Sequence, residues 1–198
     1  MSSVAPISRP IWTLPASLPR TAHRVPATKR HPEVSPGPVT DERAYELRER
    51  YHELFAGDEL PVPVESIAAD LLGLYVEEAE LDCSGLLVPA RRRVVVNAGE
   101  SAPRRRFTLA HEVGHWVCQV LEGHRAPTYC RDVDVSEAAD RQLEREANVF
   151  AAELLMPEPM VRDTWSGSIP ESAATFGVSA EAMHWRLFNL GYIQEAPT

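Results

Sequence analysis

The stretch of sequence that decides the fold is RFTLAHEVGHW, residues 106–116. At its centre, His111 and His115 are four residues apart, and Glu112 follows the first histidine directly. Because an α-helix has 3.6 residues per turn, both imidazoles lie on one face and can bind a single metal ion. Glu112 lies beside that face, where it can reach a water without displacing the metal. The spacing therefore predicts a metal site with an adjacent carboxylate.

This arrangement is the H-E-x-x-H pattern of zinc peptidases. With seven histidines and 21 glutamates in 198 residues, random order would produce the pattern about 0.03 times. The alternative is a solvated helix that carries these residues by chance. Leu109, Val113 and Trp116 argue against it, because they bury the helix, and unpaired polar groups are costly there. Gly114, a poor helix former, predicts the close approach of another element or of a substrate.

A catalytic zinc site usually has three protein ligands and one open position, so a third ligand must come from elsewhere. The helix predicted over residues 137–156 offers Glu144 and Glu146, which lie about 200° apart around the helix axis. Glu144 shares the apolar face with Ala147, whereas Glu146 lies on the mostly solvent-facing side. We therefore expect Glu144 as the third ligand. Asn148, one turn later, is expected to orient a ligating histidine.

Around these helices the sequence predicts an α+β fold. Three short β-rich runs between residues 74 and 98 are typical of a small antiparallel sheet. Helical periodicity precedes and follows them, as in α+β proteins. The expected helices cover residues 41–56, 64–72, 101–121, 137–156 and two short segments within 170–192, and the expected strands cover residues 74–77, 86–89 and 93–98.

The composition changes at about residue 40. Residues 1–40 hold eight of the 17 prolines, five basic groups and one acidic group, a charge of +4. Residues 41–198 hold 15 basic and 28 acidic groups, a charge of −13. A proline-rich, basic segment cannot bury enough surface to offset its ordering entropy, so residues 1–40 are predicted to be a disordered tail. The acidic body, residues 41–198, is the predicted folded domain, and its charge argues against direct nucleic-acid binding.

The sequence also favours a cytoplasmic protein. No apolar run approaches the roughly 20 residues of a membrane helix, and the N-terminus lacks the apolar core of a secretory signal. The three cysteines form no C-x-x-C pair, so they predict neither a disulfide framework nor a thiolate zinc site. Cys83 and Cys118 are expected to be small packing residues. A membrane partner is not expected.

The motifs resemble those of the ImmA/IrrE metallopeptidases. The likeness runs from about residue 64 to 193, including a C-terminal element from Phe176 to Gly191. The resemblance implies a zincin-like core in which His111, His115 and Glu144 bind Zn²⁺, or another divalent ion such as Mn²⁺, and Glu112 is the general base. The segments that carry it are Val94-Val95-Val96-Asn97, residues 106–115, and Glu144-x-x-Ala147-Asn148-x-x-Ala151-x-x-Leu154-Leu155-Met156-Pro157.

The resemblance also implies a substrate. Family members cleave helix-turn-helix repressors, which releases phage, mobile-element or stress genes. The strand predicted at Arg93–Asn97 resembles the edge strand on which zincins hold an extended substrate by β-augmentation. His124 and Tyr129, in the predicted loop 122–136, are candidates for stabilising the oxyanion, with ordinary surface residues as the alternative. The resemblance does not extend to the large C-terminal domain of the radiation-response members, and residues 1–40 of this chain have no counterpart in the family's motifs.

Two further features, the arginine runs and the C-terminal helical element, each allow more than one interpretation. The arginine runs at residues 91–93 and 104–106 either dock an acidic partner or nucleic acid, or are solvated charges. Residues 170–193 have a helix-turn-helix cadence, which by itself suggests DNA binding. However, residues 171–190 contain Arg186 as their single arginine and no lysine, so they offer no basic face for phosphates. A helical pair packed on the core, or a surface that recognises the repressor, fits better.

Three hypotheses follow for the function. The leading one is a zinc endopeptidase that cleaves a helix-turn-helix repressor. The second is a DNA-binding regulator in which the metal is only structural, and the acidic balance of residues 41–198 argues against it. The third is a non-catalytic protein that sequesters its repressor. Glu112 argues against the third hypothesis, because a scaffold has no need of a general base.

Overall fold

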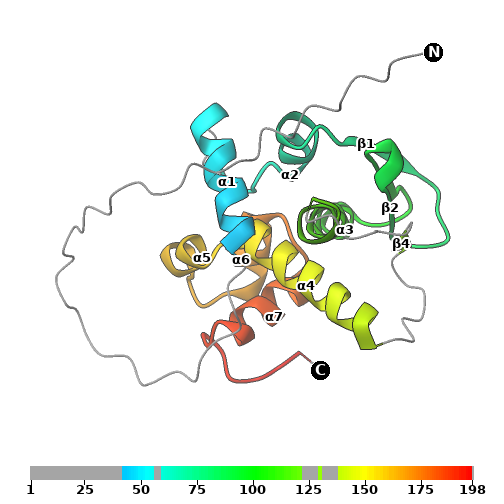
Figure 1. Cartoon of the computed structure of the whole chain (residues 1–198). Coiled ribbons are helices and arrows are strands. Elements are labelled where there is room, and N and C mark those ends of the chain that lie inside the picture. Colours follow the sequence, from blue (N-terminus) through cyan, green and yellow to red (C-terminus); the bar gives the residue numbers. More distant parts are fainter. Residues whose placement is uncertain (1–41, 56–58, 122–128, 131–137, 198) are drawn as a thin grey trace, which may run out of the picture. The chain divides into compact units, whose positions relative to one another are not determined.

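A computed structural model describes residues 42–55, 59–121, 129–130 and 138–197 of the chain (Figure 1), all within one compact unit. The predicted disordered tail at residues 1–40 lies outside the described residues. So does the predicted loop at 122–136, apart from the backbone of residues 129–130. Over the described ranges, no helix has the length and apolarity that crossing a membrane requires.

The structure confirms the α+β class, with each predicted helix and strand present within a few residues of its expected bounds. The strand β4 and the helix α5 were not predicted. In chain order the elements are α1 (Glu42–Phe55), α2 (Val64–Ser66), the π-helical turn η1 (Ile67–Leu71), β1 (Tyr75–Ala79), β2 (Gly85–Val88), the 3-10 turn η2 (Pro89–Arg91), β3 (Arg93–Asn97), α3 (Ala102–His115), the π-helical turn η3 (Trp116–Val120), β4 (Tyr129–Cys130), α4 (Ala138–Leu155), α5 (Glu158–Thr164), α6 (Ile169–Phe176) and α7 (Ala180–Asn189).

The strands form one mixed sheet in the order β1-β3-β2-β4. β2 pairs antiparallel with β3, as expected, and also with the unpredicted strand β4. β1 runs parallel to β3, with Tyr75 opposite Arg93, so the expectation of an entirely antiparallel sheet is wrong at this pair. The prediction that Arg93–Asn97 is an edge strand is therefore wrong, because β3 is hydrogen-bonded on both sides. Its run Val94–Val96 is buried throughout, and such a continuous apolar run is typical of a strand covered on both faces.

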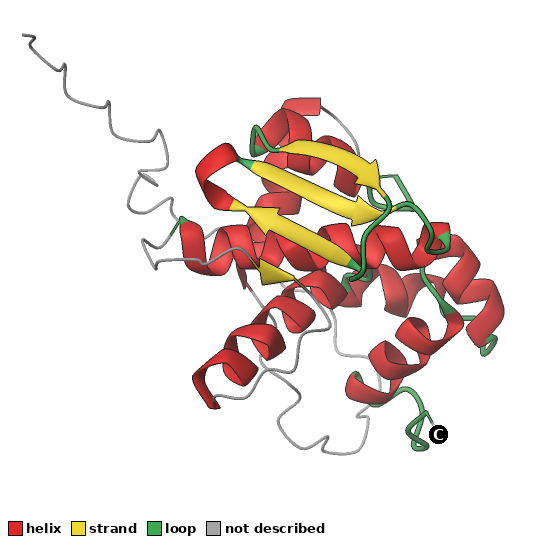
Figure 2. Cartoon of the chain, turned by 90° about the vertical axis from the view of Figure 1, so that its right-hand side faces the viewer, coloured by secondary structure: helices red, strands yellow, loops and turns green. Residues whose placement is uncertain are grey.

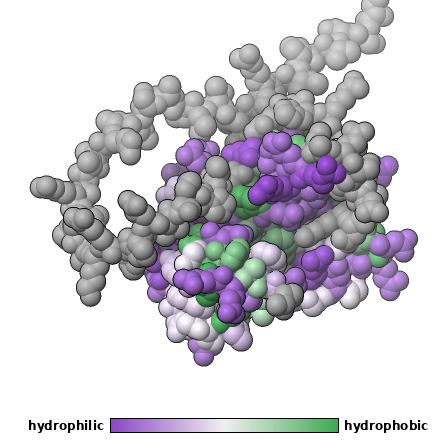
Figure 3. All heavy atoms as spheres, turned by 90° about the horizontal axis from the view of Figure 1, so that it is seen from below, coloured by the Kyte–Doolittle hydropathy of each residue, from purple (hydrophilic) through white to green (hydrophobic). Residues whose placement is uncertain are grey.

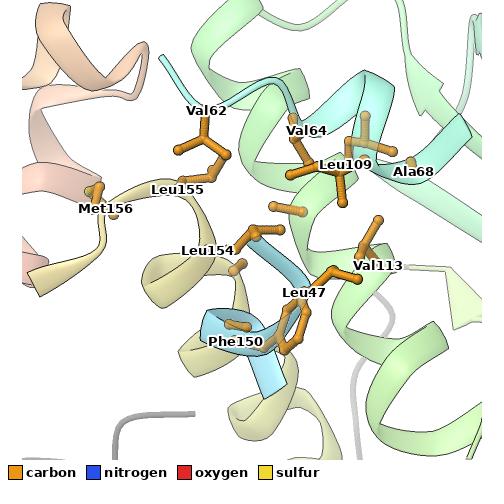
Figure 4. Packing of buried hydrophobic residues seen from close by; sticks show 14 of the residues in the cluster. Leu47, Val62, Val64, Ala68, Leu109, Val113, Phe150, Leu154, Leu155 and Met156 are labelled. Carbon is orange, nitrogen blue, oxygen red and sulfur yellow. The ribbon is translucent and has the colours of Figure 1, made fainter. Parts of the chain in front are cut away.

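The active-site candidate helix α3 contacts β2 and β3 of the sheet as well as α4 (Figures 1 and 2). One cluster of buried side chains joins these elements to α1. Figure 4 shows part of it, where Leu47 of α1 and Val113 of α3 lie near Phe150 and Leu154 of α4. The prediction that the helix containing residues 107–121 is buried on most sides is confirmed, since eight consecutive residues of α3, 108–115, are buried.

Gly114 is where α3 and α4 come closest. A Cβ atom at this position would lie 3.1 Å from both the Cα and the carbonyl oxygen of Ala147, and 3.2 Å from Cδ1 of Phe150. These contacts are tighter than most Cβ atoms make, so any larger residue would require the two helices to shift by a few tenths of an ångström. The sequence-based expectation that another element approaches Gly114 is confirmed.

The C-terminal helices α6 and α7 pack on the core through a buried arginine. Gly177 ends α6 in the left-handed conformation, with a φ of 63°, and the Ser179 hydroxyl caps α7 by accepting from the backbone N–H of Ala182. Arg186 of α7, 6% exposed, donates to the carbonyl oxygen of Met156 and pairs with Glu153 of α4 at 2.5 Å. This arginine is therefore part of the core and does not face phosphates.

The outer face of α7 is aromatic. Trp185 is 43% exposed, and its ring contacts the ring of Phe188 edge-on at a centroid distance of 6.0 Å. Figure 3 shows one face of the molecule, on which small hydrophobic areas are interspersed with hydrophilic ones. With Arg186 buried, the described part of α7 exposes an aromatic pair and no arginine or lysine.

Five of the six arginines in the two runs have partners within the chain. Arg92 donates to the carbonyl oxygens of Leu72 and Gly73, behind η1, and its guanidinium stacks over the Trp116 ring at 5.2 Å. The other four form ion pairs with glutamates, which offset the unfavourable placement of cations at the start of α3. These pairs are Arg93–Glu77, Arg104–Glu100, Arg105–Glu78 and Arg106–Glu65.

The cysteines differ from expectation at one position. Cys118, in η3, is free and buried, in agreement with its predicted role as a small packing residue. Cys83, just before β2, is buried as expected but is disulfide-bonded, which contradicts the expectation of no disulfide. The count of three cysteines without a C-x-x-C pair gives no signal for such a bond, because disulfide partners are set by tertiary proximity.

Candidate metal centre

α3 provides two imidazoles and a carboxylate from a single turn. His111, Glu112 and His115 are each fully buried, at 0% exposure. The helical spacing directs the Nε2 atoms of both histidines toward a common point, 2.9 Å from each other. Their rings stand nearly perpendicular, with centroids 4.6 Å apart and an interplanar angle of 85°. Two buried polar rings so close together are a ready donor pair for a cation.

Glu144 of α4 completes the cluster. One of its carboxylate oxygens lies 3.1 Å from Nε2 of His111, and the other lies 3.1 Å from Nε2 of His115. Across the described part of the chain, these three residues form the group that could hold a metal ion, with all ligand atoms within 4.8 Å of one another. Glu146 lies elsewhere on the helix, where its Oε1 accepts from Nε2 of Gln142 at 3.1 Å.

The two imidazoles also set the charge of Glu144. Burial alone would raise the pKa of this carboxyl group, but hydrogen bonds and charge from His111 and His115 outweigh burial. The net effect holds the pKa of Glu144 well below its ordinary value. The side chain is consequently an anion over the whole range in which proteins are stable, as a ligand for a divalent cation must be.

Each imidazole has an amide side chain behind it. Nδ1 of His111 lies 3.1 Å from Oδ1 of Asn148, one turn after Glu144 on α4. Nδ1 of His115 lies 2.9 Å from Nε2 of Gln119, in η3. Asn148 was predicted from its place on the helix, whereas Gln119 was not predicted. The available signal was its spacing, because residue 119 follows His115 by four positions, as His115 follows His111.

Glu112 faces the sheet at β2. A Cβ atom on Gly85 would lie 2.4 Å from Cγ2 of Thr108 and 3.2 Å from Oε1 of Glu112, so only glycine lets the strand approach α3 this closely. The strand that borders the carboxylate is therefore β2. Gly85 also escaped the sequence analysis, although a glycine inside a strand commonly marks a close approach of this kind.

The two candidates for the oxyanion stay predictions. His124 lies outside the described residues. Tyr129 is described by its backbone alone, which belongs to β4 and pairs with Leu87 of β2. β4 is thus next to the strand that borders Glu112, and this is all that the structure adds for these two residues.

The fold and the site together define a metallopeptidase-like class. The mixed sheet covers a buried helix with two histidines one turn apart, and the next long helix supplies a carboxylate. The sequence agrees with this assignment. Residues 64–188, more than half of the chain, match the family described as the IrrE N-terminal-like domain. The chain belongs to this family, and so to the metallopeptidases of the ImmA/IrrE type.

Two relatives illustrate the relationship. The radiation response metalloprotease IrrE of Deinococcus radiodurans is 27% identical over 144 residues, which cover 69% of this chain and 43% of that protein. Metallopeptidase ImmA of Bacillus subtilis is 25% identical over 129 residues, 62% of this chain and 73% of that protein. The chain thus spans less than half the length of IrrE and about three quarters of ImmA.

A solved structure shows the same fold. It is described as a Mycobacterium tuberculosis transcriptional regulator, and it superposes with a TM-score of 0.56 at 16% sequence identity. The match covers 74% of this chain and 46% of that one. At this identity, the likeness establishes the arrangement of the elements and nothing about the activity.

Proposed function

We propose that this protein is a zinc-dependent endopeptidase, in which His111, His115 and Glu144 hold the metal and Glu112 is the general base. The observation that carries the proposal is the convergence of three ligand atoms within 4.8 Å beside a fully buried glutamate of the same helix. Three protein ligands that leave a fourth position open are typical of catalytic zinc sites, whereas structural sites usually have four.

The chemistry of the donor set fits a borderline cation. Two imidazole nitrogens and one carboxylate suit Zn²⁺, and another divalent ion such as Mn²⁺ is the alternative. The amides of Asn148 and Gln119 stand behind the two imidazoles, as the outer partners of metal-binding histidines do. A cation would also balance the negative charges of the partly exposed Glu144 and the buried Glu112.

The residues of the chain divide the work of peptide hydrolysis among them. When bound, zinc supplies Lewis-acid chemistry, which polarises a carbonyl and lowers the pKa of water. Glu112 accepts the proton of the attacking water and then donates it to the leaving amine. His111, His115 and Glu144 remain fixed throughout, because α3 and α4 are locked together at Gly114.

We further propose that the substrate is a helix-turn-helix repressor of phage, mobile-element or stress genes. The support is membership of the family that includes IrrE and ImmA. A protein that only binds its repressor or an operator is the alternative. The buried Arg186 and the exposed Trp185 on α7 favour contact with protein over contact with DNA.

The test uses the full chain, loaded with one equivalent of zinc or stripped by a chelator, with the helix-turn-helix protein encoded by a neighbouring gene as substrate. Mass spectrometry of the products should find two fragments from a single cut, formed only by the zinc-loaded protein. A stable complex without cleavage at full zinc occupancy would instead establish a sequestering protein. A shift of operator DNA by the peptidase alone would establish the DNA-binding alternative.

A further inference from the structure

We infer that Gln119 is a positioning residue that selects the metal-binding tautomer of His115. The inference rests on the proposed function, because it concerns the metal that His115 would hold. Gln119 is 1% exposed, and its amide is 2.9 Å from Nδ1 of His115. In the described part of the chain, its Oε1 atom is buried without a hydrogen-bond partner.

The directions of the two imidazole rings decide which nitrogen of each ring must carry its proton when a metal is bound. Both imidazoles point Nε2 at the cluster, and a neutral imidazole carries its single proton on one nitrogen only. To bind a metal through Nε2, each ring must therefore carry its proton on Nδ1 and donate it to an acceptor. For His111 that acceptor is present, because Oδ1 of Asn148 faces Nδ1 at 3.1 Å.

At His115 the amide can act in either sense. With its NH₂ group toward Nδ1, the orientation that the structure shows, Gln119 would donate, which requires the proton of His115 to lie on Nε2, where it would block a metal. Rotation of the amide by half a turn places Oε1 on Nδ1. The oxygen then accepts from Nδ1–H and leaves the Nε2 lone pair free. That rotation gives the buried oxygen its partner in place of the NH₂ group.

The helix itself places Gln119 behind His115. Beyond His115, α3 widens into the π-helical turn η3, in which the backbone N–H of Leu121 donates to the carbonyl of Trp116, five residues earlier. Four residues of an α-helix overshoot a full turn by about 40°. A wider turn reduces the rotation per residue, so residues 115 and 119 stay on the same side of the helix. π-helical turns of this kind are frequent at functional sites.

The experiment measures metal affinity, and not activity, in three variants of the full chain. Gln119→Met keeps the length of the side chain but removes the hydrogen bond, so zinc affinity should fall by about 10- to 100-fold. Gln119→Glu supplies an acceptor only and should keep or raise the affinity. Gln142→Met, on the exposed side of α4, is the matched control and should bind as the wild type does. Affinity is measured by competition with a chromophoric chelator, and the visible spectrum of the cobalt(II) form reports the ligand geometry.

A second measurement does not depend on any variant folding. In zinc-loaded wild-type protein with ¹⁵N-labelled histidine, nitrogen-detected NMR should place the proton of His115 on Nδ1, in slow exchange with water. The inference would be overturned if Gln119→Met bound zinc as tightly as the wild type, or if the His115 proton were in fast exchange with water. Either result would leave the proposed function intact. A 10- to 100-fold effect in a protein that cleaves nothing would support the inference and reject the proposed function.

Discussion

The backbone of Ala147 lies so near Gly114 that a Cβ atom on the glycine would be 3.1 Å from the Ala147 carbonyl oxygen. This crossing of α3 and α4 fixes where residues one turn away on each helix meet. It therefore places Glu144, three residues before Ala147, beside His111 and His115, which flank Gly114 on the other helix.

The crossing predicts whether Gly114→Ala raises or lowers the free energy of unfolding. Helix propensity alone predicts that Gly114→Ala stabilises the protein by about 1 kcal/mol. We expect the opposite, a loss of about 1–3 kcal/mol, because the added methyl group would press against the backbone of Ala147 on the other helix. Urea denaturation followed by circular dichroism measures the change. An increase in the free energy of unfolding would show that the two helices do not meet at Gly114 as described.

The two glutamates of α4 should differ in their effect on the metal. Glu144→Gln removes the anionic ligand, so the protein should lose most of its zinc, whereas Glu146→Gln should keep one equivalent, because Glu146 contacts Gln142 instead. Zinc per chain is measured by elemental analysis after gel filtration. Zinc retained by the first variant and lost by the second would assign the ligand to Glu146.

Metal should also stabilise the fold, and acid should remove this effect. At a free zinc concentration 100 times Kd, a ligand that binds only the folded state stabilises it by about 2.7 kcal/mol. The pKa of Glu144 is lowered, so its carboxylate stays ionised as the pH falls. Metal ligands must be deprotonated, so zinc binding still competes with protons for the ligand set. The zinc-induced rise in Tm should therefore shrink from pH 7.5 to pH 5.5. A rise of equal size at both values would contradict binding through the imidazoles.

The ion pair between Glu153 and Arg186 should show strong coupling. Both side chains are buried, so Arg186→Met alone leaves an uncompensated carboxylate and should cost about 3–5 kcal/mol. The double variant with Glu153→Leu should recover most of that loss, because replacing a buried pair by apolar residues is often neutral. A double-mutant cycle in urea measures the coupling, and additive effects of the two substitutions would show that the pair is solvated.

Local patterns in the sequence predicted the parts of the site that lie on one helix. That His111 and His115 share one face follows from their four-residue spacing in a helix. Glu144 was distinguished from Glu146 because Glu144 lies on the same apolar face as Ala147. The same helical reasoning applies to Gln119, four residues after His115, but a buried amide carries no signal of its own in a sequence.

Features that depend on distant pairing were not predictable. The sequence placed β3 at the edge of the sheet, but β1 returns parallel to it and makes β3 central. Strand order is set by which strands meet across long loops, and no periodicity encodes it. The closeness of Gly85 to Glu112 has the same origin, because it depends on where β2 lies relative to α3.

The most direct test of the central claim is hydrolysis of the repressor by Glu112→Gln at full zinc occupancy, compared with equally loaded wild-type protein. Glu112 lies beside the ligand set and not within it, so the variant should hold one zinc per chain. It should cleave at least about 100-fold more slowly, as expected for loss of a general base. Equal rates of cleavage by the two proteins would contradict the account.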